Sequence, residues 1–564
     1  MKKSRLFLLL FICLSFFAFG DEPNPNVEKY QYFTLLPPLL AIVLAFITKN
    51  VVLSLILGVF SGSMLINSGS LTKSFTDLVG RIVASMADSW NAGIILQVLT
   101  IGGLIALITK MGGARAIAES LSKRAKSPAS AQVIAWIMGL FIFFDDYANS
   151  LIVGPIMKPI TDKMKISREK LAFIIDATAA PIAGLALVST WIGYEISLIK
   201  DGYALIGNTN INAYGVFIET MPYRFYNILM LIFVVMSGVM LREFGPMYKA
   251  EHRARTTGKV TEVEVDEDKG DEVLREKEGI TPTIWNALVP ILTLIISSLV
   301  GFYFNGLGTL EGEVLANVHA NPFSMYAIRE TFGASDASIV LFEAALFASI
   351  VAILMGMKQK VFKLSEAIDT WIHGMKHLVI TGVILLLAWS LSSVIKELGA
   401  SVYLVSLLSD SVPKFLLPSI IFILASIISF STGTSYGTMG ILMPLAIPLA
   451  NAVGLNNGLS DIALANYTII AVSAVLTGAI FGDHCSPISD TTILSSMGAS
   501  CDHLAHTRTQ LVYSLVVAII AVVFGYIPVS LGLNVWISLA IGTASIWALL
   551  RFYGKSVKNL KPIN

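Results

Sequence analysis

The stretch that most constrains the fold is residues 478–496, GAIFGDHCSPISDTTILSS, which places acidic, imidazole and hydroxyl side chains inside a run apolar enough to enter a bilayer. Apolar sequence flanks it on both sides, so Asp483, His484 and Asp490 are expected near the membrane midplane. An acidic residue there costs roughly 2.5 to 3.5 kcal/mol on insertion scales, so it persists mainly where it faces a cavity, an ion or another polar group. Pro487 favours a break in the helix, and a break at this depth is tolerated where it lines a polar site.

The composition is that of an all-α polytopic membrane protein. Hydrophobic residues make up 55% of the 564 residues and charged residues 14%, against about 25% charged in ordinary soluble domains. The formal net charge of +1 gives no field that would attract nucleic acid. Residues 1–20 have a basic start, an apolar core and a small-residue ending, which is typical of a secretory signal or, less commonly, of an uncleaved first helix.

The two halves of the chain carry matching residues at nearly constant spacing. Gly112 of LITKMGGA and Gly399 of SVIKELGA lie 287 residues apart. The segments DDYANSLIVGPIMKPI and TSYGTMGILMPLAIPL match at a single offset of 289 in four pairs: Tyr147 with Tyr436, Ile152 with Ile441, Pro155 with Pro444 and Pro159 with Pro448. Internal repeats of this kind are the usual sequence mark of secondary transporters.

The repeats predict a division of the chain into a first repeat at residues 31–241 and a second at residues 281–531. Residues 242–280 carry both charge signs and few bulky apolar side chains, so we expect a solvated cytoplasmic linker. Residues 532–564 are expected to add one C-terminal transmembrane helix and a cytoplasmic tail.

The distribution of Lys and Arg predicts the orientation of the repeats. Basic residues flank the first DDYAN segment on both sides, so the positive-inside rule predicts a re-entrant hairpin that begins and ends in the cytoplasm. The flanks of residues 416–449 are sparse in Lys and Arg, so the second hairpin should enter from outside. The sequence thus predicts two inverted repeats, each with a re-entrant hairpin and a broken transmembrane helix that meet at mid-depth.

Polar side chains gather at these hairpin tips and breaks. Oxygen ligands suit a hard cation such as Na+, and a carboxylate that exchanges a proton for the cation couples the two ions. The first half contributes Asp145, Asp146, Asn149, Asp176 and Thr178 as candidate ion and proton ligands, and the second contributes Asp483, Ser486 and Asp490. A substrate or second-ion site is predicted at Ser431, Thr432, Thr434, Ser435 and Thr491.

Several of these residues also have structural interpretations. Asp145 could cap the helix that follows it, and Asp176 could pair with Arg168 or Lys170 nearby in sequence. His484 suits packing or gating as well as ligation.

Two further acids, Glu195 and Glu343, lie in apolar segments. Glu343 interrupts a run otherwise free of charge, where a proton site and a subunit contact are both open interpretations.

Three segments, FFDDYANSLIVGPIMKPITDK, DATAAPIAGLALVSTWIGYE and GAIFGDHCSPISDTTILSS, resemble the signature segments of the NhaC family of sodium/proton antiporters. The resemblance implies an ion-transporter-superfamily fold with a scaffold part and a transport part, often as a homodimer, and elevator-like movement. It also implies cation and proton binding by the matching residues Asp145, Asp146, Asn149, Asp176, Asp483, Ser486 and Asp490.

The function expected is therefore exchange of Na+ for H+ across an inner membrane, with no enzymatic activity, no cofactor and no nucleic-acid partner. The alternative is a Na+- or H+-coupled transporter or exchanger of amino acids or small carboxylic acids, because the wider family resembles malate/lactate exchangers and amino-acid permeases. A membrane hydrolase using Ser486, or a metal-dependent enzyme using His484, lacks a matched base and orienting residue.

Overall fold

The chain folds almost entirely into helices. The computed structural model describes residues 25–48, 50–143, 146–186, 189, 191–262, 281, 283–408, 412–558 and 560; the predicted signal segment and Asp145 lie outside these ranges. Within them, eight helices are long and apolar enough to cross a membrane, which confirms a multi-pass membrane protein. The only strands described are β1 (Arg242–Glu243) and β2 (Lys555–Ser556), which pair antiparallel.

The first half of the chain begins with short α2 (Pro25–Tyr30) and η1 (Gln31–Leu35) before its main helices. These are α3 (Leu36–Thr48), α4 (Val51–Ile66), α5 (Leu71–Ala87), α6 (Ser89–Lys110), α7 (Gly113–Ser122), α8 (Pro128–Phe141), α9 (Asp146–Lys163), α10 (Arg168–Ala177), α11 (Ala180–Ala183), α12 (Ile192–Ala204), α13 (Ala213–Thr220), η2 (Met221–Tyr223), α14 (Phe225–Met240) and α15 (Gly245–Thr257).

The second half begins at α16 (Trp285–Leu307). It continues with α17 (Gly312–Ala320), α18 (Met325–Ala334), α19 (Ala337–Lys358), α20 (Leu364–His377), α21 (Val379–Leu398), α22 (Ala400–Leu408), α23 (Leu417–Thr432), α24 (Ser435–Asn456), α25 (Asp461–His484), α26 (Asp490–Gly498), α27 (His503–Ala521), η4 (Val522–Tyr526), α28 (Ile527–Ser530), α29 (Val535–Ala548) and η5 (Leu549–Tyr553).

The helices recur in the two halves in the same order. The series α5 to α9 in the first half corresponds to α20 to α24 in the second, with similar lengths and spacings, and Gly112 and Gly399 both adopt left-handed backbone angles, with φ of +68° and +70°. The halves also exchange contacts: α6 packs on α19 and α20, while α21 packs on α4 and α5. Each half therefore supplies the neighbours of the other.

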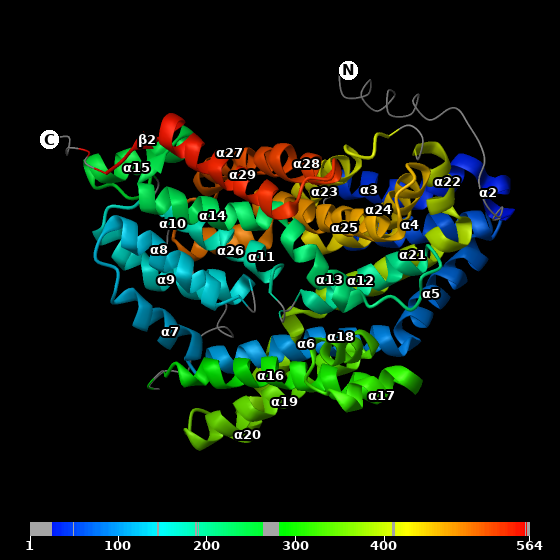
Figure 1. Cartoon of the computed structure of the whole chain (residues 1–564). Coiled ribbons are helices and arrows are strands. Elements are labelled where there is room, and N and C mark those ends of the chain that lie inside the picture. The colour runs from blue at the N-terminus through cyan, green and yellow to red at the C-terminus, as the bar shows by residue number, and fades with distance from the viewer. Residues whose placement is uncertain are drawn as a thin grey trace.

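Figure 1 shows how this exchange arranges the molecule. Helices α16, α17, α18, α19 and α20 lie with α6 along one side, whereas the pair α8 and α9 lies towards the left end of the view and the pair α23 and α24 towards the right. Helix α9 packs against α26, and α24 packs against α12. The two hairpin-like pairs thus each contact an element of the opposite half.

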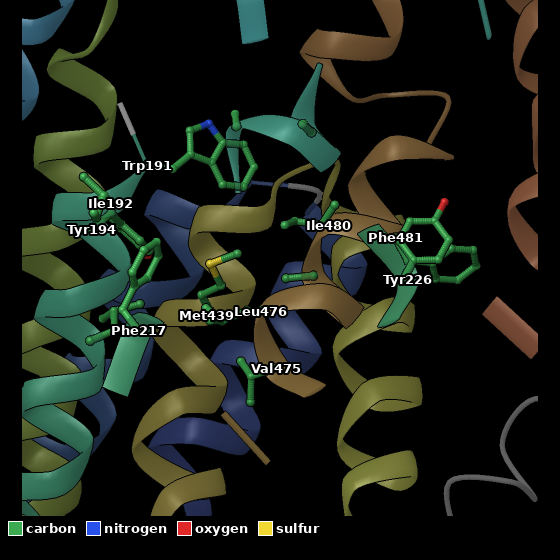
Figure 2. Packing of buried hydrophobic residues seen from close by; sticks show 14 of the residues in the cluster. Trp191, Ile192, Tyr194, Phe217, Tyr226, Met439, Val475, Leu476, Ile480 and Phe481 are labelled. Atoms are coloured by element: carbon green, nitrogen blue, oxygen red, sulfur yellow. The ribbon is translucent and has the colours of Figure 1, made fainter. Parts of the chain in front are cut away.

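Apolar side chains fill the space between these elements. Trp191 and Tyr194 pack on the ring of Tyr436, with centroids 4.9 and 4.7 Å away, and Tyr226 packs on Phe481 at 5.0 Å (Figure 2). From Tyr467 to its end at His484, α25 is buried without interruption. This helix therefore forms the centre of the packed body, and its C-terminal end begins the polar stretch of residues 478–496.

Both predicted helix breaks are present. Helix α10 ends at Ala177, the short α11 follows, and the next helix in the described part of the chain is α12 from Ile192; α25 ends at His484 and α26 begins at Asp490. Pro487 lies in the second interruption, as expected from a residue that cannot donate a backbone hydrogen bond.

The structure departs from the linker expected at residues 242–280 in its first part. Residues 242–257 form β1 and α15, and Glu243 is fully buried against Lys170, whose Nζ lies 3.0 Å from Oε1 of Glu243. Charge composition alone could not show this, because the buried basic partner lies about 70 residues earlier. Residues 263–280 lie outside the described part of the chain.

Candidate functional site

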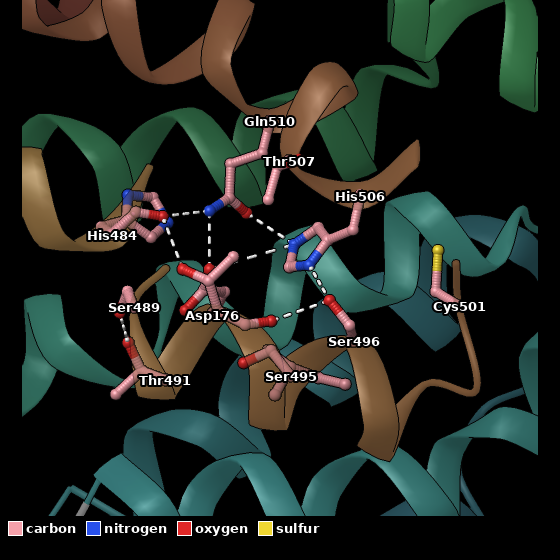
Figure 3. Close-up of polar contacts among 12 residues, drawn as sticks. Asp176, His484, Ser489, Thr491, Ser495, Ser496, Cys501, His506, Thr507 and Gln510 are labelled. Atoms are coloured by element: carbon pink, nitrogen blue, oxygen red, sulfur yellow. Dashed lines mark hydrogen bonds and ion pairs between the residues drawn. The ribbon is translucent and has the colours of Figure 1, made fainter. Parts of the chain in front are cut away.

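The two helix breaks meet at the carboxylate of Asp176. This residue is fully buried and lies one position before the end of α10. Helix α10 packs against α26 and α27 of the second half. The Oδ2 atom of Asp176 accepts a hydrogen bond from Nε2 of Gln510 at 2.6 Å, and Nε2 of His506 lies 3.9 Å from it (Figure 3). The hydroxyls of Thr492 and Ser495 also face this carboxylate.

A chain of polar contacts on α27 orients this arrangement. The side chain of Gln510 donates to Asp176 and to the carbonyl oxygen of His484, so its Oε1 must accept from Nε2 of His506, 2.8 Å away. Nδ1 of His506 lies 2.8 Å from the hydroxyl oxygen of Ser496, which also contacts the carbonyl oxygen of Thr492 at 2.8 Å. The network places a proton on Nε2 of His506 and points the amide group of Gln510 towards Asp176 and the end of α25.

The first hairpin-like pair is tied to the first break by Asn149. Its Nδ2 donates to the carbonyl oxygens of Gly139 at 3.0 Å and Thr178 at 2.6 Å, two backbone groups near helix ends. Because the amide group has both of these acceptors, the opposite atom of Asn149 is its carbonyl oxygen.

Helix α9 also contacts α26 directly. The hydroxyls of Ser150 and Ser495 lie 3.0 Å apart. A Cβ added at Gly154 would overlap the backbone of Gly498, so the two helices touch through main-chain atoms. Asp146 begins α9 and is buried.

The second acid, Asp483, is held by the tip of the second pair. Its Oδ2 accepts hydrogen bonds from the backbone nitrogen of Ser435 at 3.2 Å and from the hydroxyl of the same residue at 2.8 Å. Gly433, at φ +68°, permits the sharp turn before α24, and a Cβ there would lie 2.6 Å from the carbonyl oxygen of Ile488. The hydroxyl of Ser486 donates to the carbonyl oxygen of Phe430 at 2.7 Å. The second tip and the second break are therefore fastened together.

His484 lies next to Asp483 and joins the two acid environments. Its Nδ1 forms a hydrogen bond with the hydroxyl of Tyr226 at 2.7 Å, and its ring packs 6.4 Å from the ring of Phe173. Its Nε2 is buried and has no hydrogen-bond partner among the described residues. The contacts of Nδ1 and of the ring thus agree with the packing interpretation of His484, whereas its Nε2 has room for a further contact.

Three buried oxygen atoms of the site have no hydrogen-bond partner within the described part of the chain: Oδ1 of Asp176, Oδ1 of Asn149 and Oδ1 of Asp483. Such atoms normally have partners, and leaving one unpaired costs about 1 to 3 kcal/mol. All three are acceptors, so the group that would satisfy them is a donor or a cation.

Neither site acid is paired with a lysine or arginine among the described residues. The basic partners proposed for Asp176 are committed elsewhere, because Lys170 pairs with Glu243 at 3.0 Å and Arg168 pairs with Asp162 at 3.2 Å. His506, 3.9 Å from Asp176, would act as a counter-ion only if its ring carried a second proton.

Other predicted residues lie at the margin of the site. Asp490 begins α26 and is exposed, and the hydroxyl of Thr491 lies 3.0 Å from that of Ser489. The hydroxyls of Ser431 and Thr432 bond to carbonyl oxygens one turn back in their own helix, and Thr434 occupies the N-cap position of α24.

The two acids with open roles lie apart from this group. Glu195 is fully buried and pairs with Arg224, with 2.7 Å between Oε2 and Nη2. Glu343 is exposed on α19.

Several contributing residues were not among the sequence candidates. They are Gln510 and His506 of α27, Ser495 of α26 and Tyr226 of α14. The available signal for the first two was HLAHTRTQ, which places polar side chains one helical turn apart at the start of an apolar span.

A body of membrane-length helices with two interrupted helices and buried, unpaired carboxylates defines a polytopic transporter. The sequence matches the Na+/H+ antiporter family over residues 29–186 and 182–528, and the chain belongs to this family.

Two relatives illustrate the similarity. A Haemophilus influenzae protein described as uncharacterized is 34% identical over 500 residues, covering 88% of this chain and 90% of the relative. The Malate-2H(+)/Na(+)-lactate antiporter of Bacillus subtilis is 36% identical over 121 residues, which is 20% of this chain and 24% of that protein.

Solved structures share the fold. The Alcanivorax borkumensis YdaH transporter aligns with a TM-score of 0.55 at 15% identity and covers 91% of this chain and 100% of its own. The Neisseria gonorrhoeae MtrF structure aligns with a TM-score of 0.51 at 12% identity, covering 84% of this chain and 86% of its own.

Proposed function

We propose that this protein is a secondary transporter that exchanges Na+ for H+ across the inner membrane, using Asp176 and Asp483 as the ion-binding carboxylates. The observation that carries the proposal is that both acids are buried, lack a lysine or arginine partner, and each present an oxygen with no hydrogen-bond partner among the described residues. A buried carboxylate is tolerated when it is protonated or neutralised by a cation. Na+ and H+ are the two species that can alternate in this role.

Coupling follows from competition at one carboxylate. Carboxylate, amide and hydroxyl oxygens are the ligands that a hard cation prefers, and Oδ1 of Asp176, Oδ1 of Asn149 and the hydroxyl of Thr492 offer them at the first break. A proton that binds Asp176 removes the negative charge that attracts Na+. Arrival of either ion therefore favours release of the other.

Access from the two sides is proposed to alternate through inverted repeats. The pairs α8–α9 and α23–α24 would be re-entrant hairpins entering from opposite faces, and their places towards opposite ends of Figure 1 support this arrangement. The group α16 to α20 with α6 would be the scaffold, against which the remaining helices move in an elevator-like way. A homodimer contact would lie on this scaffold; the apolar side chains exposed on α16 and α19 suit a lipid neighbour as well as a second subunit.

The test is transport in sealed proteoliposomes that contain a pH-sensitive dye. Addition of Na+ should drive proton movement in the wild-type protein, and Asp176→Asn and Asp483→Asn should abolish it. Asp461→Asn, at an exposed position at the start of α25, is the control and should transport normally. Normal exchange by both site variants would refute the assigned roles.

A second candidate is coupled transport of a small carboxylic acid. It is favoured by the similarity to an antiporter of malate and lactate and by the second tip, where the backbone nitrogen and hydroxyl of Ser435 already hold a carboxylate group. Counterflow of radioactive lactate or malate in the same proteoliposomes distinguishes the candidates, because a plain cation antiporter gives none.

A further inference from the structure

A polar cavity lies away from the helix breaks, between α5, α6, α12 and α21. It has a volume of about 550 Å³, within the roughly 300 to 1,000 Å³ of typical small-ligand sites. Its polar lining includes Asp77, Arg81, Asn91, Asp201, Ser392 and Lys396. None of these residues belongs to the site described above.

Most of the charge in this cavity is internally satisfied, but one carboxylate is not. Arg81 bonds Asp77 at 2.9 Å and the hydroxyl of Ser393 at 2.7 Å, and it also pairs with Glu397. By contrast, Oδ2 of Asp201 is buried without a hydrogen-bond partner among the described residues.

The groups that face Asp201 leave room for a small ligand. The hydroxyl of Ser392 faces the Asp201 carboxylate, yet its Oγ also lacks a hydrogen-bond partner in the described chain. Lys396 acts on Asp201 electrostatically, but the two form no salt bridge in the described structure. The Asp201 oxygen has no donor in the described structure, and the Ser392 hydroxyl can turn its lone pairs towards the cavity, so the two are suited to a cation that arrives with part of its water.

Helix α12 connects this cavity to the second hairpin tip. Asp201, Ser197 and Tyr194 recur at spacings of four and three residues and so share one face of the helix. At the middle position, Trp389 of the cavity lining donates from Nε1 to the hydroxyl of Ser197 at 2.8 Å. At the position nearest the second hairpin tip, the hydroxyl of Tyr194 donates to the carbonyl oxygen of Tyr436. Tyr436 adjoins Ser435, which holds Asp483.

We propose that this cavity is a capture site for a monovalent cation on its way to Asp483, with Asp201 and Ser392 as its oxygen ligands. The charge of Lys396 opposes the cation and keeps its binding weak enough for onward passage.

The cavity includes Asn91 near the start of α6, whereas Lys110 ends the helix, about 30 Å away at 1.5 Å per residue. The positive-inside rule predicts the Lys110 end to be cytoplasmic, so the cavity opens on the opposite face. This inference rests on the proposed Na+ transport.

The test compares two variants with opposite expected effects on the Na+ concentration that gives half-maximal exchange. Measured in proteoliposomes of uniform orientation, with Na+ added on the cavity side, Asp201→Asn should raise this concentration about five- to tenfold and Lys396→Gln should lower it by a similar factor. The maximal rate should stay within about twofold of wild type. Opposite shifts cannot arise from a common folding defect. Asp461→Asn, an exposed acid at the start of α25, is the control.

Unchanged half-maximal concentrations in both variants would overturn the capture site while leaving the central site intact. Equilibrium binding of radioactive Na+ to solubilised Asp483→Asn protein separates the two proposals further. Residual binding that disappears when Asp201→Asn is added supports the capture site even if the wild-type protein moves no protons. Absence of any Asp201-dependent binding overturns it.

Discussion

Two kinds of buried carboxylate lie within the same helical body. Glu195 and Glu243 are each paired with an internal cation, Arg224 at 2.7 Å and Lys170 at 3.0 Å. Asp176 and Asp483 are equally enclosed but bond only to neutral donors, an amide in one case and a serine in the other. The charges of Glu195 and Glu243 are balanced within the protein, whereas those of Asp176 and Asp483 depend on a cation or proton supplied from outside.

Burial does not distinguish the acids that stabilise the fold from those proposed to bind ions, whereas the presence of an internal cationic partner does. A paired buried acid stabilises its surroundings only while its partner is present, because loss of one member leaves an isolated charge. An unpaired acid has no internal partner to lose, so its neutralisation should not destabilise the fold. Four experiments test this difference, ordered from the largest expected effect to the smallest.

Arg224→Met should lower the free energy of unfolding by about 3 to 5 kcal/mol, because it leaves the Glu195 carboxylate buried without its partner. Arg224 also donates to Thr220 and to the carbonyl oxygen of Gly184, so part of the loss comes from those acceptors. Thermal unfolding in detergent measures the effect. The double variant with Glu195→Gln should recover part of the loss; no recovery would show that the ion pair is not its source.

Asp176→Asn and Asp483→Asn should retain the thermal stability of the Na+-free protein but lose stabilisation by Na+. Wild-type protein should gain stability as Na+ binds, and removal of one ligand charge should weaken Na+ binding by about 3 kcal/mol, roughly a hundredfold. Melting curves over a series of NaCl concentrations, with choline chloride holding ionic strength, show the difference. Equal Na+ responses in the variants and wild type would show that Asp176 and Asp483 have a structural role and do not bind Na+.

Asn149→Ala should cost about 2 kcal/mol of stability, because it removes donors from two carbonyl oxygens, those of Gly139 and Thr178. Transport should fall as well, since the first break loses its link to α9. Ser150→Ala, one residue on and with a hydroxyl contact to Ser495, provides a milder comparison. Equal stability of the two variants would mean that the Asn149 link does not hold the break.

Ser435→Ala should have the smallest effect. The variant loses the hydroxyl bond to Asp483 but keeps the backbone N–H bond, so a change of about 1 kcal/mol, or roughly fivefold in the half-maximal Na+ concentration, is expected. Ser431→Ala is the matched control, because its hydroxyl bonds only to Ile427 in its own helix. A similar change in both variants would remove Ser435 from the site.

Much of the fold could be predicted from the sequence. The apolar composition predicted a body of membrane helices, and eight of the described helices are long and apolar enough to cross a bilayer. The constant offset between Gly112 and Gly399 predicted corresponding positions in the two halves, and both adopt a left-handed backbone. Pro487 and the polar run around it predicted the second break. These features depend on local residue types or on direct repetition, which one chain displays by itself.

The partners within the site were less predictable. Gln510 reaches Asp176 across 334 positions of sequence, and Lys170 reaches Glu243 rather than the nearer Asp176. Proximity in sequence favoured the wrong partner for Asp176, because helix packing, which decides the pairing, joins distant segments. The folded part of the charged region, α15, was missed for the same reason.

The main-chain contact between Gly154 and Gly498 ties the two halves of the chain together. One glycine belongs to each half, and each helix meets the other at a position without a side chain. A methyl group at either glycine would overlap the opposite backbone and force α9 and α26 apart. The closeness of the two halves at this point therefore depends on hydrogen atoms standing where other residues carry a side chain.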